Sequence, residues 1–174
     1  MREHEFTLVI EGRVADEAVL DALYEAGCSD ATLGTVDGTG YGDFHRRASS
    51  FLEAVVSAIH DVESVPGLRV RRIEPDDLVT MAEIAERLGR SRESVRLLVC
   101  GRRGRGDFPA PASHLRSRSR LWRWSEVAAW AGLGSADDRH AARLIATLNA
   151  ALELRRQGEE LPGRERSLVQ AVAG

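Results

Sequence analysis

Residues 80–101 (TMAEIAERLGRSRESVRLLVCG) carry start and stop signals for two short helices that are separated by one glycine. Thr80 and Glu83 form a capping box, in which the hydroxyl and the carboxylate each bind a free backbone N–H at a helix start. Gly89 permits the sharp turn that follows, because glycine has no Cβ to clash there. Ser91 can cap the second helix, and a further glycine ends it. This order predicts a helix-turn-helix.

Apolar residues in this stretch recur at the spacing of one buried helix face. Ile84, Ala85 and Leu88 fall together on the first helix, and Val95 and Leu98 fall together on the second. The opposite face of the second helix would then be exposed to solvent or to a ligand.

The net charge of −3 conceals a division along the chain. Residues 1–79 contain 7 Arg against 16 Asp and Glu, whereas residues 80–124 contain 11 Arg against 4 acids. Residues 125–174 are nearly balanced, with 6 Arg against 7 acids. A phosphate backbone responds to the field of the face that it meets, so the basic middle is the part expected to bind a polyanion.

Further pieces follow the two helices in an order that a known family shares. Residues 108–111 (FPAP) come first, then an arginine-rich stretch at 114–120, and then residues 121–127 (LWRWSEV). Residues 79–131 thereby resemble the winged helix-turn-helix of the MerR/AlpA/excisionase group of DNA-binding proteins. In that group a recognition helix is followed by a Phe-Pro segment, a β-hairpin wing and a Trp-containing Ser-Glu-Val helix start. Arg90 departs from the pattern, since the residue after the turn glycine is usually small and apolar.

The resemblance implies that residues 92–100 form a recognition helix for the major groove. Arginine can bond guanine O6 and N7 together, and a carboxylate can accept from cytosine N4. An ordinary solvated face is the alternative. The residues expected to read bases are Ser91, Arg92, Glu93 and Arg96.

Arginines beyond this helix are expected to hold the DNA backbone or a minor groove. The wing, residues 112–121, mixes guanidinium with hydroxyl and imidazole groups, which suits such contacts. A polar loop without a ligand is the alternative. The expected contacts are Arg102, Arg103, Arg105, His114, Arg116, Arg118 and Arg120. Trp122, Trp124 and Trp130 are expected to pack in the core.

Residues 1–75 predict the element order βαββαβ. Phe6, Leu8 and Ile10 occupy alternate positions, as on a strand with one buried face. The order resembles the ferredoxin-like fold, in which two helices pack on one face of a four-stranded sheet. It implies a regulatory or protein-interaction domain that takes a protein partner or a small-molecule effector. The expected elements are a strand at 6–10, a helix at 15–26, strands at 31–36 and 41–47 around a turn at 37–40, a helix capped by Ser50 and Glu53, and a strand at 68–73.

A polar junction at 74–77 separates the N-terminal domain from the DNA-binding part. The C-terminal segment, residues 136–174, follows the DNA-binding part. A long helix is expected at 136–157, with an apolar stripe that includes Leu144, Ile145 and Leu152. The stripe either completes the core of the monomer or pairs two copies. We expect a homodimer, which would place two recognition helices about one DNA turn, roughly 34 Å, apart.

Catalytic and metal chemistry find little support in the sequence. The glycines of 37–42 are explained by a hairpin turn, because no Lys-Ser/Thr follows them at a helix start. The histidines are scattered, and no Ser/His/Asp or Cys/His set is visible, so we expect no enzyme, cofactor or metal. An acylphosphatase-like activity would need an arginine-containing glycine loop, which residues 11–14 (EGRV) only approach.

Other features bear on location and partners. Cys28 and Cys100 lack metal-type spacing, which favours a reducing cytoplasm. No apolar run approaches the roughly 18 residues of a membrane span, and the charged start argues against a signal peptide. The acidic row Glu17, Asp21 and Glu25 is either solvated or a docking face for a basic partner.

The sequence thus predicts a cytoplasmic α+β protein with a ferredoxin-like domain, a winged helix-turn-helix and a C-terminal helix. Its expected function is sequence-specific binding of double-stranded DNA as a transcriptional regulator. Two alternatives stay open: an antitoxin-like or adaptor protein whose N-terminal domain binds a protein, and an excisionase-like factor that bends DNA.

Overall fold

The computed structural model describes residues 1–117 and 119–173. It contains helices and antiparallel sheets, so the chain is α+β as predicted. The chain divides into two compact units. Unit 1 comprises residues 1–75 and 147–174, and unit 2 comprises residues 76–146. No described helix combines the length and the apolar character that would let it cross a membrane.

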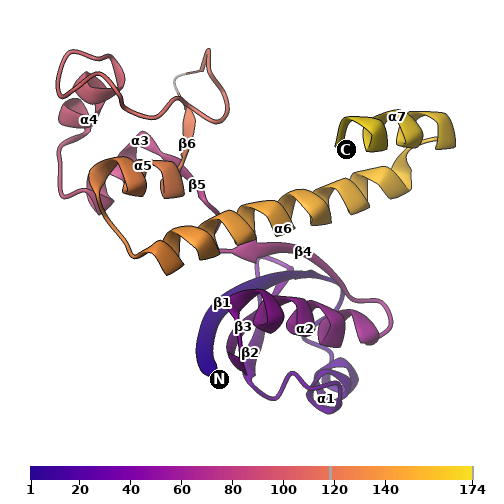
Figure 1. Cartoon of the computed structure of the whole chain (residues 1–174). Coiled ribbons are helices and arrows are strands. Elements are labelled where there is room, and N and C mark those ends of the chain that lie inside the picture. Colours follow the sequence, from indigo (N-terminus) through magenta and orange to yellow (C-terminus); the bar gives the residue numbers. More distant parts are fainter. Residues whose placement is uncertain (118, 174) are drawn as a thin grey trace. The chain divides into compact units, whose positions relative to one another are not determined.

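Unit 1 begins with six elements, labelled in Figure 1, whose order matches the prediction for residues 1–75. They are β1 (Arg2–Glu11), α1 (Glu17–Glu25), β2 (Ala31–Val36), β3 (Thr39–Ala48), α2 (Phe51–Ser64) and β4 (Arg69–Glu74). The four strands form one antiparallel sheet in the order β2-β3-β1-β4. The two outer strands of this sheet are therefore β2 and β4.

One face of the sheet is buried because apolar residues alternate along its central strands. Phe6, Leu8 and Ile10 of β1 are almost completely buried. The α2 helix covers this face: its Phe51 ring meets the Phe6 ring edge-on, with 5.9 Å between centroids. The helix also buries Ala54, Val55, Ala58 and Val62.

A hairpin turn joins β2 to β3, as the sequence predicted, but it takes only two residues instead of the four expected at 37–40, because β3 already begins at Thr39. Asp37 and Gly38 both have positive φ angles, +50° and +79°, and Val36 pairs with Thr39 across the turn. Positive φ at both central positions is the signature of a type I′ hairpin turn, which is why Asp-Gly suits it. The glycines of 37–42 thus belong to a hairpin.

The capping box predicted at the start of α2 forms only in part. The Ser50 side chain accepts from the Glu53 N–H at 3.2 Å, as expected. The Glu53 carboxylate, however, accepts from the backbone and hydroxyl of Ser49, not from the Ser50 N–H. The Glu53 N–H at this helix start is therefore capped, whereas the Glu53 carboxylate binds the residue before the N-cap.

A buried arginine ties β3 to the helices of unit 1. The Arg46 guanidinium donates to both oxygens of Asp30, at 2.8 and 3.0 Å, and to Asp61 at 2.7 Å. Its remaining N–H groups reach the Ser57 hydroxyl and the Gly27 carbonyl. Every donor of the fork is therefore satisfied, which is the condition for burying this charge. Sequence reasoning missed this cluster, because its members are far apart along the chain.

The outer edge of β4 is covered by side chains. The Asn149 amide binds Ile73 twice, accepting from its N–H at 2.8 Å and donating to its carbonyl at 2.9 Å. The Glu63 carboxylate accepts from the Val70 N–H at 2.9 Å, and Arg155 donates to that carboxylate at 2.9 Å. These contacts hold the helix that carries Asn149 against β4 (Figure 1).

That helix, α6 (Ala136–Glu160), corrects the expectation of a separate C-terminal segment at 136–174. Its residues up to Ala146 belong to unit 2, and those from Thr147 onward belong to unit 1, together with α7 (Gly163–Ala173). The stripe predicted for pairing two copies is buried within the chain at Ile145 and Leu152, which are 6% and 8% exposed. Leu144 and Leu148 are half-buried and Ala151 is exposed, so the stripe packs within the chain only in part.

Unit 2 is built from two short strands and three short helices, followed by the start of α6. A two-stranded antiparallel sheet pairs β5 with β6. Its core consists of Val79, Ile84, Ala85, Val95, Trp122 and Val127. The elements are β5 (Leu78–Thr80), α3 (Met81–Arg87), α4 (Arg92–Val99), β6 (Leu121–Arg123) and α5 (Trp124–Ala131).

The predicted helix signals of unit 2 are confirmed. The Thr80 N–H donates to the Glu83 carboxylate at 2.7 Å, and the Thr80 hydroxyl accepts from the Glu83 N–H at 3.3 Å. Gly89 has a φ of +61°, and the Arg90 N–H returns to the Ala85 carbonyl at 2.8 Å. Arg90 thus closes the helix with its backbone while its side chain stays exposed. This is why an arginine is tolerated after the turn glycine.

Candidate nucleic-acid interface

The α4 helix exposes the charged residues that the sequence assigned to base reading. Val95 and Leu98 are buried, and Arg92, Glu93 and Arg96 are exposed. The hydroxyl of Ser91 accepts from the Ser94 N–H at 3.1 Å, so its acceptor capacity serves the helix cap. Ser91 can still offer its O–H proton to a ligand.

Two of these residues form a pair. Arg96 donates to the two oxygens of Glu93, from Nε at 2.8 Å and from Nη2 at 2.7 Å. These bonds lower the pKa of the Glu93 carboxyl from its ordinary value, so it is ionised near neutral pH. The helix therefore presents an acceptor and a set of donors side by side, with Arg92 exposed at its start.

A glycine-rich loop follows α4 and carries the next three arginines. Gly101, Gly104 and Gly106 all have positive φ angles, between +65° and +78°. The loop folds back on the helix, because the N–H groups of Arg102 and Arg103 both donate to the Leu97 carbonyl, at 2.9 and 3.2 Å.

The three arginines of this loop lie in different settings. The Arg103 side chain lies 3.4 Å from the Ser94 hydroxyl of α4, so loop and helix are brought together there. Arg105 lies 3.4 Å from Asp107, and Arg102 is exposed. Only Arg103 is thus placed against the predicted recognition helix by a contact of its own side chain.

The wing, residues 112–121, differs from the β-hairpin that was expected. In the described residues its base is closed by a bridge between Ser113 and Leu121, in which the Ser113 N–H donates to the Leu121 carbonyl at 3.3 Å and the Leu121 N–H donates to the Ser113 carbonyl at 3.2 Å. Beyond the bridge, residues 114–117 make a turn and no strand is formed in the described residues. The cause is the sequence, since serine and arginine offer no alternating apolar face for a ladder to bury.

The wing side chains predicted to contact DNA lie in the following positions. His114 has a φ of +55° and its Nδ1 lies 3.0 Å from the Ser113 hydroxyl. Arg116 is exposed, and the Arg120 guanidinium lies over the Trp122 ring at 5.8 Å. Arg118 lies outside the described residues. Figure 1 shows α4, the glycine loop and the wing at the same end of unit 2.

The prediction that the tryptophans pack in the core is confirmed for Trp122, whereas Trp124 and Trp130 are only partly buried. Trp122 is fully buried and donates to the Pro109 carbonyl at 3.2 Å. Trp130 packs edge-on against Phe108 at 4.9 Å and donates to Asp107 at 2.8 Å. The Phe-Pro segment between loop and wing is thereby fixed to the core.

Asp77 is a residue whose role the sequence reading missed, because it was placed in the polar junction 74–77. It is 4% exposed and caps α5 from a distance: its carboxylate accepts from the Ser125 N–H at 2.7 Å and from the Ser125 hydroxyl at 2.8 Å. The residue before α5, Arg123, has no side-chain oxygen to cap the helix, so Asp77 supplies the cap.

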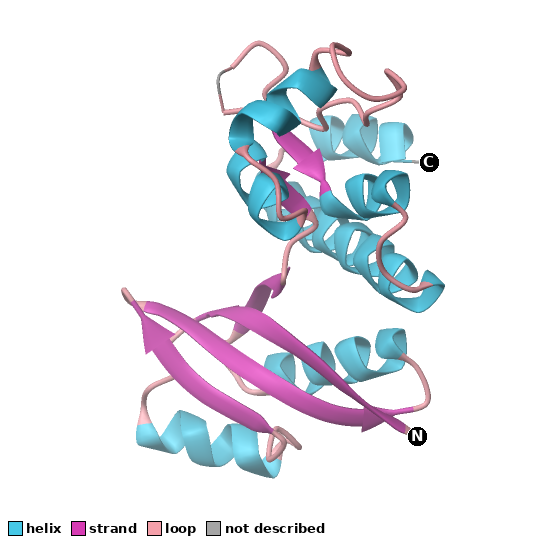
Figure 2. Cartoon of the chain, turned by 90° about the vertical axis from the view of Figure 1, so that its left-hand side faces the viewer, coloured by secondary structure: helices cyan, strands magenta, loops and turns pink. Residues whose placement is uncertain are grey.

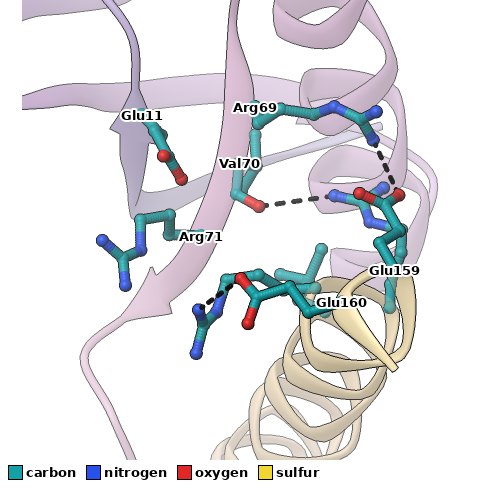
Figure 3. Close-up of a pocket in the computed structure, with 9 residues that line it drawn as sticks. Glu11, Arg69, Val70, Arg71, Glu159 and Glu160 are labelled. Carbon is teal, nitrogen blue, oxygen red and sulfur yellow. Dashed lines mark hydrogen bonds and ion pairs between the residues drawn. The ribbon is translucent and has the colours of Figure 1, made fainter. Parts of the chain in front are cut away.

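Unit 1 contains a pocket of about 260 Å³ between β4 and α6 (Figure 3). It is a candidate binding site for the small-molecule effector that was expected for the N-terminal domain. Its arginines are largely paired with acids. Arg155 binds Glu63, Arg156 binds Glu153, and Arg69 lies 3.5 Å from Glu159. The pocket is therefore the ion-paired seam that fastens α6 to β4. Arg71, at its rim, is exposed.

Among the described residues, a group of potential metal ligands that the sequence did not reveal meets on β1 and β3. Glu3 and Glu5 of β1 lie beside His45 of β3, with ligand atoms within 4.8 Å of one another. All three are exposed, and Arg47 lies 3.9 Å from Glu3. The acidic row Glu17, Asp21 and Glu25 is exposed as well. Exposed carboxylates are well solvated, so neither group by itself indicates a ligand.

Comparisons with protein-family models, with curated protein sequences and with solved structures found no match to this chain.

Proposed function

We propose that unit 2 is a winged helix-turn-helix of the MerR/AlpA/excisionase type and that the protein is a sequence-specific, double-stranded DNA-binding regulator of transcription. One observation carries the proposal: α4, the helix that follows the Gly89 turn, buries Val95 and Leu98 and exposes two guanidinium groups and a carboxylate. Such a helix end can enter a major groove and meet base edges.

The proposed mechanism is binding, without catalysis. Arg92, Glu93 and Arg96 read base edges, and Ser91 caps the helix that carries them. Arginine suits guanine, whereas the carboxylate suits cytosine N4. The remaining arginines and His114 hold phosphates or a minor groove, which positions the helix without reading sequence. They are Arg102, Arg103, Arg105, His114, Arg116, Arg118 and Arg120.

Unit 1 is proposed as a ferredoxin-like regulatory or protein-interaction domain. The strand order β2-β3-β1-β4 and the α2 helix on the buried face support that fold. Its acidic residues keep it off the DNA, because phosphates repel carboxylates. A cytoplasmic location and a homodimer complete the proposal, since two copies would read two half-sites about one turn, roughly 34 Å, apart.

The test is selection of bound duplexes from a random pool by the full chain, followed by titration of the enriched sequence. Arg96→Ala should weaken binding to that sequence, whereas Arg164→Ala, an exposed arginine of unit 1, should not. A motif that Arg96→Ala still binds fully would contradict the assignment of α4. Enrichment of bent or flexible duplexes without a motif would favour a DNA-bending factor instead.

A further inference from the structure

The two edges of the unit 1 sheet, whose strands are drawn in magenta in Figure 2, are treated differently. At β4, the outward backbone groups of Ile73 and Val70 are bound by Asn149, Glu63 and Arg155. Side chains that bind the edge in this way leave no place for another strand. At the opposite edge, β2 has no comparable cover among the described residues.

The backbone of β2 points alternately toward β3 and away from it. The His45 N–H donates to the Asp30 carbonyl at 3.0 Å, which shows that even-numbered residues here face β3. Ala31, Leu33 and Thr35 therefore point their N–H and C=O groups outward. The Ala31 N–H donates to the Cys28 carbonyl at 3.1 Å, but in the described part of the chain Leu33 and Thr35 have no partner on this side.

The sequence of β2 lacks the features that keep an exposed edge from pairing. Its six residues, ATLGTV, include no charge and no proline, and its register with β3 is regular, without a bulge. Charges, prolines and bulges are the usual protection of an open edge.

We propose that β2 pairs antiparallel with β2 of a second copy of the chain, so that the two sheets join across a two-fold axis. A two-fold axis requires one residue of β2 to lie opposite the same residue of the second copy, and Leu33 or Gly34 can take this place with equal overlap. We assign Leu33, with Ala31 opposite Thr35, because the two Leu33 side chains then lie side by side on one face of the joined sheet. The N–H and C=O of Leu33 then bond the C=O and N–H of Leu33 in the second copy. The Thr35 N–H donates to the Ala31 carbonyl of the second copy.

Two observations favour a second copy over an unrelated strand. The paired segment is self-complementary in this register. Its half-buried Leu33 lies on the same face of the sheet as Gly42 and Phe44, where it would contact Leu33 of the second copy. On α6, Ile145 and Leu152 are buried within the chain, so these two residues of its apolar stripe are not available to a second copy. This interface specifies how the proposed homodimer forms, and it stands or falls without DNA.

The first test measures the mass of the full chain by light scattering over a range of concentrations. Thr35→Pro removes an outward N–H and blocks the edge, but it leaves the ladder with β3 intact because that N–H does not face β3. Thr35→Val keeps the N–H and is the matched control. The wild type and Thr35→Val should be dimers, and Thr35→Pro should dissociate at least about ten-fold more readily. A monomeric wild type, or a folded Thr35→Pro that remains as dimeric, would overturn the proposal.

The second test is independent of whether Thr35→Pro folds. In a Cys100→Ser background, Leu33→Cys should form a covalent dimer under mild oxidation, because hydrogen-bonded antiparallel partners lie about 5.5 Å apart at Cα, within disulfide range. Thr35→Cys should not form a covalent dimer, because the Cα atoms of residue 35 in the two copies would lie about 13 Å apart. Equal cross-linking of both variants, or of neither, would contradict the Leu33-centred register.

Discussion

Arg96 is bound to Glu93, three residues earlier on α4, by hydrogen bonds of 2.8 and 2.7 Å to its two carboxylate oxygens. The arginine is therefore oriented before any ligand arrives, and part of its charge is neutralised by its neighbour. In the proposed interface, a carboxylate in this position would repel phosphates and so lower the affinity for any duplex that does not offer a matching base edge. The pair is thus expected to serve specificity more than affinity.

Replacing Glu93 tests this reading. Glu93→Gln removes one negative charge and releases Arg96, so affinity for unrelated duplexes should rise and the logarithmic salt slope should steepen by about one. Fluorescence anisotropy at several salt concentrations measures both quantities. Glu126→Gln, an exposed acid on α5, is the control. Equal behaviour of Glu93→Gln and wild type would show that the pair has no part in DNA binding.

Base and backbone contacts should respond differently to truncation. Arg96→Ala should cost about 1–3 kcal/mol on the selected sequence and relax discrimination at one base pair. Arg116→Ala, in the wing, should weaken all duplexes alike and reduce the salt slope by about one. Competition titrations with single-base variants separate the two effects. The reverse pattern would exchange the proposed roles of helix and wing.

The Asp77 carboxylate should matter for stability rather than for binding. Asp77→Ala leaves the Ser125 N–H and hydroxyl without their buried acceptor, which should lower the free energy of unfolding of unit 2 by about 1–3 kcal/mol. Urea denaturation followed by tryptophan fluorescence reports this, because all three tryptophans lie in unit 2. As a control, Asp21→Asn, at an exposed acid, should change the urea midpoint little. The capping role would be refuted if Asp77→Ala had the same midpoint as Asp21→Asn.

The Arg46 cluster should be among the most sensitive points of unit 1. Arg46→Ala leaves Asp30 and Asp61 facing each other with no cation, which should destabilise unit 1 by about 3–5 kcal/mol. The adjacent Arg47 is exposed on the other face of β3, so Arg47→Ala should lie within about 0.5 kcal/mol of wild type. Hydrogen exchange of β3 amides reports both changes, and similar protection in both variants would contradict the prediction.

The two cysteines should differ in reactivity. Burial raises the pKa of the Cys28 thiol to about 11, from an ordinary value of 9.0, whereas Cys100 is exposed. Because the folded state favours the neutral thiol, the stabilisation from Cys28 is complete below pH 9 and is lost as the pH rises through 11. At pH 8 a thiol reagent should label Cys100 alone in the folded protein. Labelling of both at equal rates would contradict the burial of Cys28.

Local signals were sufficient for much of the fold. The Thr80–Glu83 box, the Gly89 turn and the Asp37-Gly38 hairpin each involve neighbours in sequence, and each is present as predicted. Their chemistry is complete within a few residues, so one sequence reveals them.

Contacts between distant residues could not be predicted in this way. Asp77 reaches Ser125 across 48 positions, and Asn149 reaches Ile73 across 76. Nothing in the local pattern distinguishes Asp77 from a linker acid, because its partner is defined only once β5 has paired with β6. The stripe of α6 was read as a pairing surface for the same reason: periodicity reveals a buried face but not what buries it.

The candidate site lies between these cases. The exposure of Arg92, Glu93 and Arg96 followed from the burial of Val95 and Leu98, whereas the Glu93–Arg96 pair was not foreseen although the residues are three apart. The wing was predicted as a hairpin by resemblance, but its described residues form no ladder beyond the Ser113–Leu121 bridge.

The most direct measurement is the affinity of the full chain for the duplex selected from a random pool, compared with a scrambled duplex at physiological salt. The account predicts a shared motif whose affinity exceeds that of the scrambled duplex by at least about 10³-fold, with most of the difference lost in Arg96→Ala. Selection without a motif, or equal affinity for both duplexes, would contradict it.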